Sequence, residues 1–247
     1  MSTIASWCER NKLHLNPDKC IFINFTLKFS ETTFEYAINN KILPQKHTIK
    51  DLGVILDTKL KFDQHIYYVV NTAYKNLGFI IRITKKFKNI TSLKILYSSI
   101  VRSGLEYACQ VWSPFYDKYI CLIERVQKKF TRHLAFKANF RADYSGRLTK
   151  FAMRELSERR IYLATCLLFK MIHRITLCSV SEHINFNLSS HDTRCKPTFA
   201  IPISGTNTVH NQPIVRMMRN FNSRFNGINI CSLQFCSFKN FVHNLLQ

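Results

Sequence analysis

The spacing of apolar residues changes along this chain, and the change lies near Phe62. Before it, apolar residues come in short β-branched and aromatic runs. After it, they recur every three or four residues, which is the period of an amphipathic helix. The first helical stripe consists of Ile66, Val69, Val70, Ala73, Leu77 and Ile80. We therefore predict an α+β chain, in which a small antiparallel sheet precedes a mainly α-helical bundle.

The sheet is expected from four short segments. They are Cys20–Phe25, Phe34–Ile38, Lys41–Leu43 and Ile49–Leu56. The first is a β-branched and aromatic run typical of a buried strand. The middle two flank Asn39-Asn40, which tolerate positive φ and indicate a hairpin. Gly53 interrupts the last segment, and a glycine inside a strand indicates a bulge or a close approach to the backbone.

The same patterns predict three regions with boundaries at 1–61, 62–175 and 176–247. The middle region carries the main helices, because three further stripes follow the first one, within 93–101, 120–134 and 161–175. The last region begins with a polar stretch, 176–212, that we interpret as a linker. Two short helices are expected beyond it, at 215–225 and 232–246.

Charge is the strongest global signal. The chain has 36 Lys and Arg against 15 Asp and Glu, a formal charge of +21. Such an excess favours polyanions, with nucleic acid first and anionic membrane second. Since no window approaches the ~18 uninterrupted apolar residues of a membrane span, we expect nucleic acid as the partner and no membrane.

The cysteines indicate a reducing compartment. There are nine, without a CxxC pair or a regular framework, and the first ten residues lack the apolar core of a signal peptide. We therefore expect reduced thiols in a cytoplasmic or nuclear protein that is not secreted.

The positive charge is concentrated between Arg82 and Arg141, where thirteen Lys or Arg accompany three acidic residues. Two cation clusters lie there, one just past a helix and one at i, i+3, i+4 and i+7 of another: Lys85, Lys86 and Lys88, and Arg125, Lys128, Lys129 and Arg132. Such faces neutralise several phosphates in a salt-sensitive contact. The alternative is an ordinary solvated helix face, but few acids balance these cations, so we favour binding.

Other candidate sites are weaker. Five aromatic residues interleave with the cations and could stack on bases, although helical spacing is more typical of core: Tyr116, Tyr119, Phe130, Phe136 and Phe140. Two Cys and His groups fit no common zinc spacing: Cys178, His183, His191 and Cys195, and Cys231, Cys236 and His243. His65 and His133 have no evident catalytic partner. We therefore predict no metal, no cofactor and no small-molecule substrate for this chain.

Five phrases carry a family resemblance. They are WCERNKLHLNPDKCIFINF, IKDLGVILDTKLKFDQHI, LKILYSSIVRSGLEYACQVWSP with IERVQKKFTRHL, LSERRIYLATCLLFKMIHRI, and QPIVRMMRNFN. In this order they resemble the C-terminal part of reverse transcriptases from non-LTR retrotransposons, the jockey-like LINE group. The resemblance covers nearly all of residues 2–245. It implies that 1–61 is the end of a polymerase palm with a primer-grip hairpin, 62–175 a helical thumb, and 176–247 the family's tail.

The resemblance also implies roles for individual residues. Lys19 falls on the palm lysine proposed to protonate the departing pyrophosphate, as a general acid that also neutralises negative charge. Leu52, Gly53 and Val54 match the primer-grip turn, where a glycine lets a nucleic-acid strand approach the backbone. The alternatives are a solvated lysine that could pair with Asp18, and an ordinary strand with a bulge.

The sequence departs from the family at the catalytic carboxylates. Such polymerases hold two Mg²⁺ ions ~4 Å apart with an adjacent aspartate pair and a third carboxylate. This chain has no adjacent pair, its seven aspartates are scattered, and it is expected to begin after that turn. We predict a truncated reverse transcriptase fragment that grips template and primer without turnover. The alternatives are a host-retained nucleic-acid-binding module and a decayed reading frame.

Overall fold

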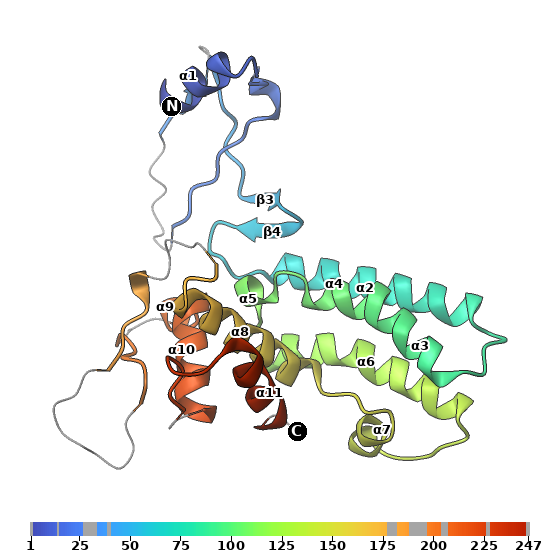
Figure 1. Cartoon of the computed structure of the whole chain (residues 1–247). Coiled ribbons are helices and arrows are strands. Elements are labelled where there is room, and N and C mark those ends of the chain that lie inside the picture. The colour runs from blue at the N-terminus through green and yellow to red at the C-terminus, as the bar shows by residue number, and fades with distance from the viewer. Residues whose placement is uncertain are drawn as a thin grey trace. The chain divides into compact units, whose positions relative to one another are not determined.

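The computed structural model describes residues 2–13, 15–26, 34–38, 41–176, 182–187, 197–203, 207–225 and 228–245. The chain forms two compact units, Met1–His65 and Ile66–Gln247. Helices predominate, and the described strands form two small antiparallel sheets (Figure 1). The predicted α+β class is therefore confirmed.

The described part of the first unit contains one complete helix, a 3-10 turn and four short strands. These are α1 (Ser2–Arg10), η1 (Pro17–Lys19), β1 (Ala37–Ile38), β2 (Lys41–Ile42), β3 (Thr48–Asp51) and β4 (Val54–Asp57). Strands β1 and β2 pair antiparallel, with Ala37 opposite Ile42. This confirms the hairpin predicted around Asn39-Asn40, two residues that lie outside the described part of the chain.

The single strand predicted for Ile49–Leu56 is wrong, because the chain reverses within it. Leu52 and Gly53 both have positive φ, 43° and 85°, and Asp51 pairs with Val54 across the turn. Two central residues with positive φ are the mark of a type I′ turn, which joins antiparallel strands tightly. Gly53 is therefore part of a hairpin turn between β3 and β4, and not a bulge.

The predicted buried strand Cys20–Phe25 is also wrong. The segment forms one isolated parallel bridge, between Phe22 and Gln45, through bonds from Phe22 N to Pro44 O (3.2 Å) and from Lys46 N to Phe22 O (3.0 Å). Pro44 has no N–H to donate, so the pairing does not extend along this side. Phe25 accordingly stays 48% exposed.

The second unit is built from helices. Their bounds are α2 (Asp63–Ile83, whose first residues belong to the first unit), α3 (Ile90–Leu96), the π-helical η2 (Tyr97–Arg102), α4 (Ser103–Glu106), α5 (Cys109–Trp112), α6 (Asp117–Lys137), α7 (Tyr144–Lys150), α8 (Leu156–Ile172), α9 (Asn207–His210), α10 (Pro213–Arg224) and α11 (Phe235–Leu245). The two short C-terminal helices expected from the sequence correspond to α10 and α11.

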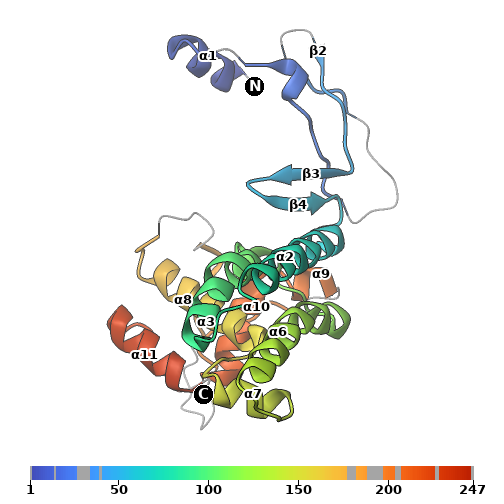
Figure 2. The same ribbon diagram turned by 90° about the vertical axis from the view of Figure 1, so that its right-hand side faces the viewer.

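The predicted apolar stripes supply most of the core of this unit, although Ile100 of the 93–101 stripe is 37% exposed. All six residues of the first stripe are buried on α2, and Ile123, Gln127, Phe130 and Leu134 are buried on α6. Helix α8 contacts α5, α6, α10 and α11 (Figures 1 and 2). Its residues Leu168 and Phe169 share one apolar cluster with Phe221 of α10 and Phe238 of α11.

The helix predicted to reach Ile175 ends three residues earlier. Arg174 has a φ of 53°, Ile175 N donates to Lys170 O (2.9 Å), and Arg174 N donates to Met171 O (3.1 Å). This pair of bonds is the Schellman motif, which closes a helix through a left-handed residue. Ile175 consequently lies outside the apolar stripe and is 57% exposed.

Candidate nucleic-acid interface

Lys85, Lys86 and Lys88 project from the loop between α2 and α3, and all three are exposed. The loop is held by Lys137 of α6. Its ammonium donates to the backbone oxygens of Thr84 (3.1 Å), Lys85 (3.0 Å) and Phe87 (2.7 Å). These carbonyls follow the C-terminal end of α2, where a cation is favoured and backbone acceptors need partners.

The contacts of Lys137 also locate the three lysines in the bundle. The α2–α3 loop and the C-terminal end of α6 lie at the same end of the unit (Figure 1). On the far side of the loop, the Asn89 side chain accepts hydrogen bonds from Thr91 N (2.8 Å) and Ser92 N (3.3 Å) and caps α3. Both ends of this cationic loop are therefore fixed by hydrogen bonds, so the lysines project from an ordered backbone.

The four cations predicted on one helix face all lie on α6. Arg125, Lys129 and Arg132 are exposed, and Lys128 is half-buried. Lys128 lies over the Tyr144 ring of α7 (4.9 Å from Nζ to the centroid), and Lys129 lies over the Tyr74 ring of α2 (5.4 Å). The stripe thus spreads over both flanks of α6, and cation–π contacts orient two of its members.

Two of the three acidic residues of this region, Glu106 and Glu124, have partners within the fold. Glu106 binds Arg159 through two hydrogen bonds, one of them 2.9 Å from Nη2 to Oε2, and lies 4.0 Å from Arg102 Nε. The bonds to Glu106 raise the pKa of Arg159. Glu124 is buried, and Asp117 opens α6. Within the part of the chain that the structure describes, no carboxylate forms an ion pair with any of the seven predicted cations.

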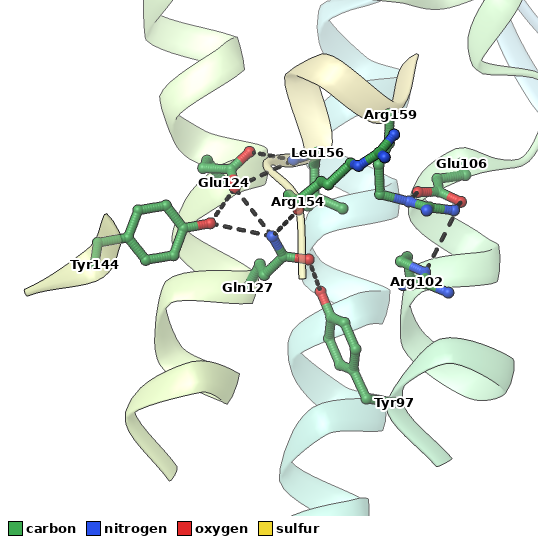
Figure 3. Close-up of polar contacts among 9 residues, drawn as sticks. All are labelled: Tyr97, Arg102, Glu106, Glu124, Gln127, Tyr144, Arg154, Leu156 and Arg159. Carbon is green, nitrogen blue, oxygen red and sulfur yellow. Dashed lines mark hydrogen bonds and ion pairs between the residues drawn. The ribbon is translucent and has the colours of Figure 1, made fainter. Parts of the chain in front are cut away.

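A buried polar network centred on Gln127 fixes α6 to its neighbours (Figure 3). Tyr97 of η2 donates to Gln127 Oε1 (3.3 Å), and Gln127 Nε2 donates to Arg154 O (2.8 Å), Tyr144 Oη (3.1 Å) and Glu124 Oε1 (3.3 Å). A buried side chain with this many partners holds its surroundings in one arrangement. The network therefore holds α6, with its cations, in register with η2, α7 and the start of α8.

Glu124 is the acidic member of the network. Its carboxylate accepts from Leu156 N (3.0 Å to Oε2) and from the Tyr144 hydroxyl. Burial raises the pKa of Glu124, although the bond from Tyr144 opposes that shift. Burial also raises the pKa of Tyr144 and of Tyr97, so both hydroxyls stay protonated and able to donate. This network was not predicted from the sequence, where the signal for it is a glutamine, Gln127, within an apolar stripe.

The five interleaved aromatic residues divide into two groups. Tyr119 and Phe130 are buried, and Phe130 stacks on Tyr97 at 4.0 Å between ring centroids. Tyr116 and Phe136 are exposed, Phe136 to 82%, and Phe140 is half-buried. Core packing therefore accounts for only part of this set.

The residues implied by the resemblance lie in the first unit. Lys19 ends η1, is exposed, and lines a hollow of about 660 Å³ with Cys20–Asn24. Its neighbour Asp18 pairs with Lys41 instead. Leu52 and Gly53 form the exposed tip of the β3–β4 hairpin, and Val54 is buried at its base. The polymerase roles of Lys19 and of this hairpin stay predictions.

The candidate metal ligands are only partly visible. Cys178, His191 and Cys195 lie outside the described residues, whereas His183, Cys231, Cys236 and His243 are exposed. Among the residues that are described, no three His, Cys, Asp or Glu side chains gather as metal ligands would. None of the described helices combines the length and the apolar character needed to cross a bilayer.

Sequence comparison finds relatives over about half of the chain. An uncharacterized protein of Caenorhabditis elegans is 30% identical over 114 residues, which are 46% of this chain and 57% of that protein. The probable RNA-directed DNA polymerase from transposon X-element of Drosophila melanogaster is 25% identical over 130 residues. The RNA-directed DNA polymerase from mobile element jockey of Drosophila funebris is 28% identical over 138 residues.

These matches cover 52% and 55% of this chain but only 14% and 15% of the two polymerases. The chain thus spans slightly more than half the length of the nematode relative and a small part of the polymerases. No family model matches the chain, and no solved structure matches it. The chain is therefore related in sequence to the RNA-directed DNA polymerases of mobile elements.

Proposed function

We propose that this chain is a thumb-containing portion of a non-LTR reverse transcriptase that grips a template–primer duplex by its backbone and has no catalytic carboxylates of its own. The observation that carries the proposal is a group of cations on the bundle that have no carboxylate partner among the described residues: Lys85, Lys86 and Lys88 on the loop and Arg125, Lys128, Lys129 and Arg132 on α6. Relatedness to RNA-directed DNA polymerases supports a nucleic acid as the polyanion.

The physical basis of the grip is phosphate neutralisation. Each cation that contacts a phosphate releases a condensed counterion. The logarithm of the binding constant therefore falls linearly with the logarithm of the salt concentration, with a slope of about −0.9 for each phosphate contacted. Lysine and arginine contacts to phosphates position a duplex without reading its sequence. The proposed grip is accordingly strong at low salt and indifferent to base sequence.

The proposed lack of turnover rests on the carboxylates. Two-metal phosphoryl transfer needs clustered acidic ligands. The sequence has no adjacent aspartate pair, and among the described residues Asp18 and Asp57 each have local partners, Lys41 for the former and the backbone N–H groups of Lys59, Lys61 and Phe62 for the latter. In the proposal, Mg²⁺ belongs to carboxylates of an intact parent polymerase.

The grip is tested by titrating a blunt RNA–DNA hybrid at several salt concentrations. The double variant Lys86→Gln/Lys88→Gln removes two exposed loop cations, and it should lower the slope of log affinity against log salt by about 2. The control Arg174→Gln/Lys239→Gln removes the same charge from exposed positions after α8 and on α11, and it should leave the slope near that of the parent chain. Equal salt-dependence slopes for the two double variants would contradict binding through a specific cationic face.

The absence of turnover is tested by primer extension. The purified chain is incubated with a primed RNA template, deoxynucleotides and Mg²⁺ or Mn²⁺. We expect no nucleotide addition, because the described residues include no acidic cluster that could hold the metals. Metal-dependent extension that survives removal of trace polymerase by a second purification would overturn this half of the proposal.

A further inference from the structure

A hollow of about 680 Å³ opens where α6 ends and the chain turns towards α7. Its lining contains three arginines, two phenylalanines and no carboxylate: Arg132, Ala135, Phe136, Asn139, Phe140, Arg141, Ala142 and Arg147. Small-molecule sites usually measure about 300–1,000 Å³, so the hollow has the size of a site for one nucleotide.

The walls of the hollow are fixed by hydrogen bonds. Asn139 has a φ of 49°, Phe140 N donates to Ala135 O (2.9 Å), and Asn139 N donates to Phe136 O (3.3 Å). This is the Schellman closure of α6. Arg147, which is 9% exposed, donates to Ala142 O (2.8 Å) and holds the loop from the other side. The hollow therefore exists before any ligand arrives.

The charges around the hollow favour an anion. Arg132 and Arg141 are exposed at its rim, and neither has a carboxylate partner among the described residues. The nearest acid in sequence, Asp143, accepts a hydrogen bond from Gly146 N (2.8 Å) and caps α7. Planar guanidinium groups bind phosphate through paired hydrogen bonds, which gives direction as well as attraction.

The two aromatic rings of the hollow differ. Phe140 packs edge-on against Phe151 (6.4 Å between centroids) and lies beneath Lys150 (5.6 Å). Phe136 is 82% exposed and has no ring partner in the described chain. One exposed apolar side chain is ordinary by itself. An exposed ring beside two rim arginines has the combination of stacking surface and phosphate ligand that single-stranded nucleic acid uses.

We propose that this hollow receives one unpaired nucleotide of a strand that leaves the gripped duplex, with Phe136 stacking on its base and Arg132 and Arg141 contacting its phosphates. The inference deepens the proposed function and rests on it, because the duplex grip delivers the strand end. Lys137 ties the lysine-bearing loop to the same end of α6 on which the hollow opens. The ligand is thus a duplex with an overhang, and base identity matters little because every base has a stacking face.

The test compares a blunt RNA–DNA hybrid with the same hybrid carrying a three-nucleotide overhang that has 2-aminopurine at its first unpaired position. The full-length chain should bind the overhanging hybrid more tightly and quench the 2-aminopurine. Phe136→Ala should lower affinity for the overhanging hybrid about tenfold, as loss of one base–aromatic stack does. It should abolish the quenching and leave affinity for the blunt hybrid unchanged.

Four further variants separate stacking and rim contacts from general effects. Phe136→Trp keeps a stacking ring and should retain the quenching. Phe79→Ala removes a half-exposed ring from α2 and should change the affinity for neither hybrid. Arg132→Gln should lower the affinity for the overhanging hybrid more than the affinity for the blunt one. Arg125→Gln, two turns earlier on α6, should lower both affinities equally. Circular dichroism of each variant checks that the helices are retained.

The inference and the proposed function fail in different ways. Equal affinity of the chain for both hybrids would overturn the assignment of the hollow as a nucleotide site. An equal loss of affinity for both hybrids in Phe136→Ala would do the same, and neither result would contradict the duplex grip. Absence of salt-dependent binding to the blunt hybrid would overturn the grip and the delivery of a strand end with it. Quenching of free 2-aminopurine riboside triphosphate without any duplex would assign the hollow to free nucleotides and overturn the strand-end assignment.

Discussion

The two units of the chain bury very different amounts of apolar surface. Among the described residues of Met1–His65, the buried apolar side chains are Cys8, Leu43 and Val54, whereas every other buried apolar side chain belongs to Ile66–Gln247. The helical unit has whole stripes facing a shared core. The strand unit has two hairpins and leaves large side chains exposed, including Phe34 at 64% and Ile42 at 59%.

The difference indicates where folding stability resides. Hydrophobic burial is the main favourable term in folding, and an isolated two-stranded hairpin is at best marginally stable in water. The helical unit should therefore fold by its own core. The strand unit leaves large apolar side chains exposed that a further contact surface would cover.

The largest expected effect comes from separating the two units. A chain of residues 61–247 should unfold cooperatively within a few degrees of the full-length protein, because it retains α2 and the entire helical core. A chain of residues 1–60 should show no cooperative transition. Thermal scans followed by circular dichroism at 222 nm measure both. A cooperative transition in 1–60, or its absence in 61–247, would reverse the comparison.

The next largest effect comes from Phe130, which is fully buried on α6 and stacks on Tyr97. Phe130→Ala should lower the free energy of unfolding by about 3–5 kcal/mol, through lost burial and the cavity left behind. Phe136→Ala, six residues further on the same helix, is the matched control. It should change the free energy of unfolding by less than about 0.5 kcal/mol, because that ring is on the surface. Urea titration of the two variants measures the contrast, and similar midpoints would contradict the assigned core.

A third effect depends on pH and tests the buried network. Burial raises the pKa of Glu124 in the folded state above its ordinary value of 4.5, so the folded state holds this proton more tightly than the unfolded state. Ionisation then costs stability: the contribution of Glu124 to the free energy of unfolding falls as pH rises from 4.5 to the raised pKa, and is level above it. Glutamine does not ionise, so Glu124→Gln lacks this pH-dependent contribution to the free energy of unfolding.

The measurement is urea unfolding of the parent chain and Glu124→Gln at several pH values between 4 and 8. The advantage of the parent chain over the variant should shrink as pH rises, by about 1.4 kcal/mol for each unit by which the folded-state pKa is raised. Parallel pH profiles would show that burial does not raise the pKa of Glu124 in the folded state.

The same contrast between units explains which features could be predicted from the sequence. Helical periodicity is local, so the six residues of the first stripe and the α6 stripe were identified from spacing alone. Strand assignment depends on a partner: Cys20–Phe25 has strand composition, but Pro44 on the opposing segment removes the donor that a ladder would need.

The candidate site divides in the same way. The clusters around Lys86 and Lys129 could be named from charge and spacing, which are sequence properties. The buried role of Gln127 could not, because it depends on a backbone group from a distant segment, Arg154 O. The hollow beside Phe136 could not either, because it depends on how the chain closes α6 and turns back through the bond from Arg147 to Ala142 O. The residue pattern predicted Ile49–Leu56 as one strand, because leucine is not a residue that usually signals a type I′ turn; a turn at Leu52, Gly53 and Val54 was implied only by the family resemblance.

The smallest expected effect lies at that turn. Leu52 has a φ of 43° and is 83% exposed, and a residue with a Cβ in the left-handed region costs about 1–2 kcal/mol, less for asparagine. Leu52→Asn gives the Asn-Gly pair that type I′ turns prefer and should slow amide hydrogen exchange in β3 and β4 several-fold. Gly53→Ala, at a φ of 85°, should accelerate it. Because the helical unit has its own core, exchange in α6 should be the same in both variants. A change in α6 would show that the hairpin and the bundle are coupled in stability, and the contrast between the units would then be one of degree.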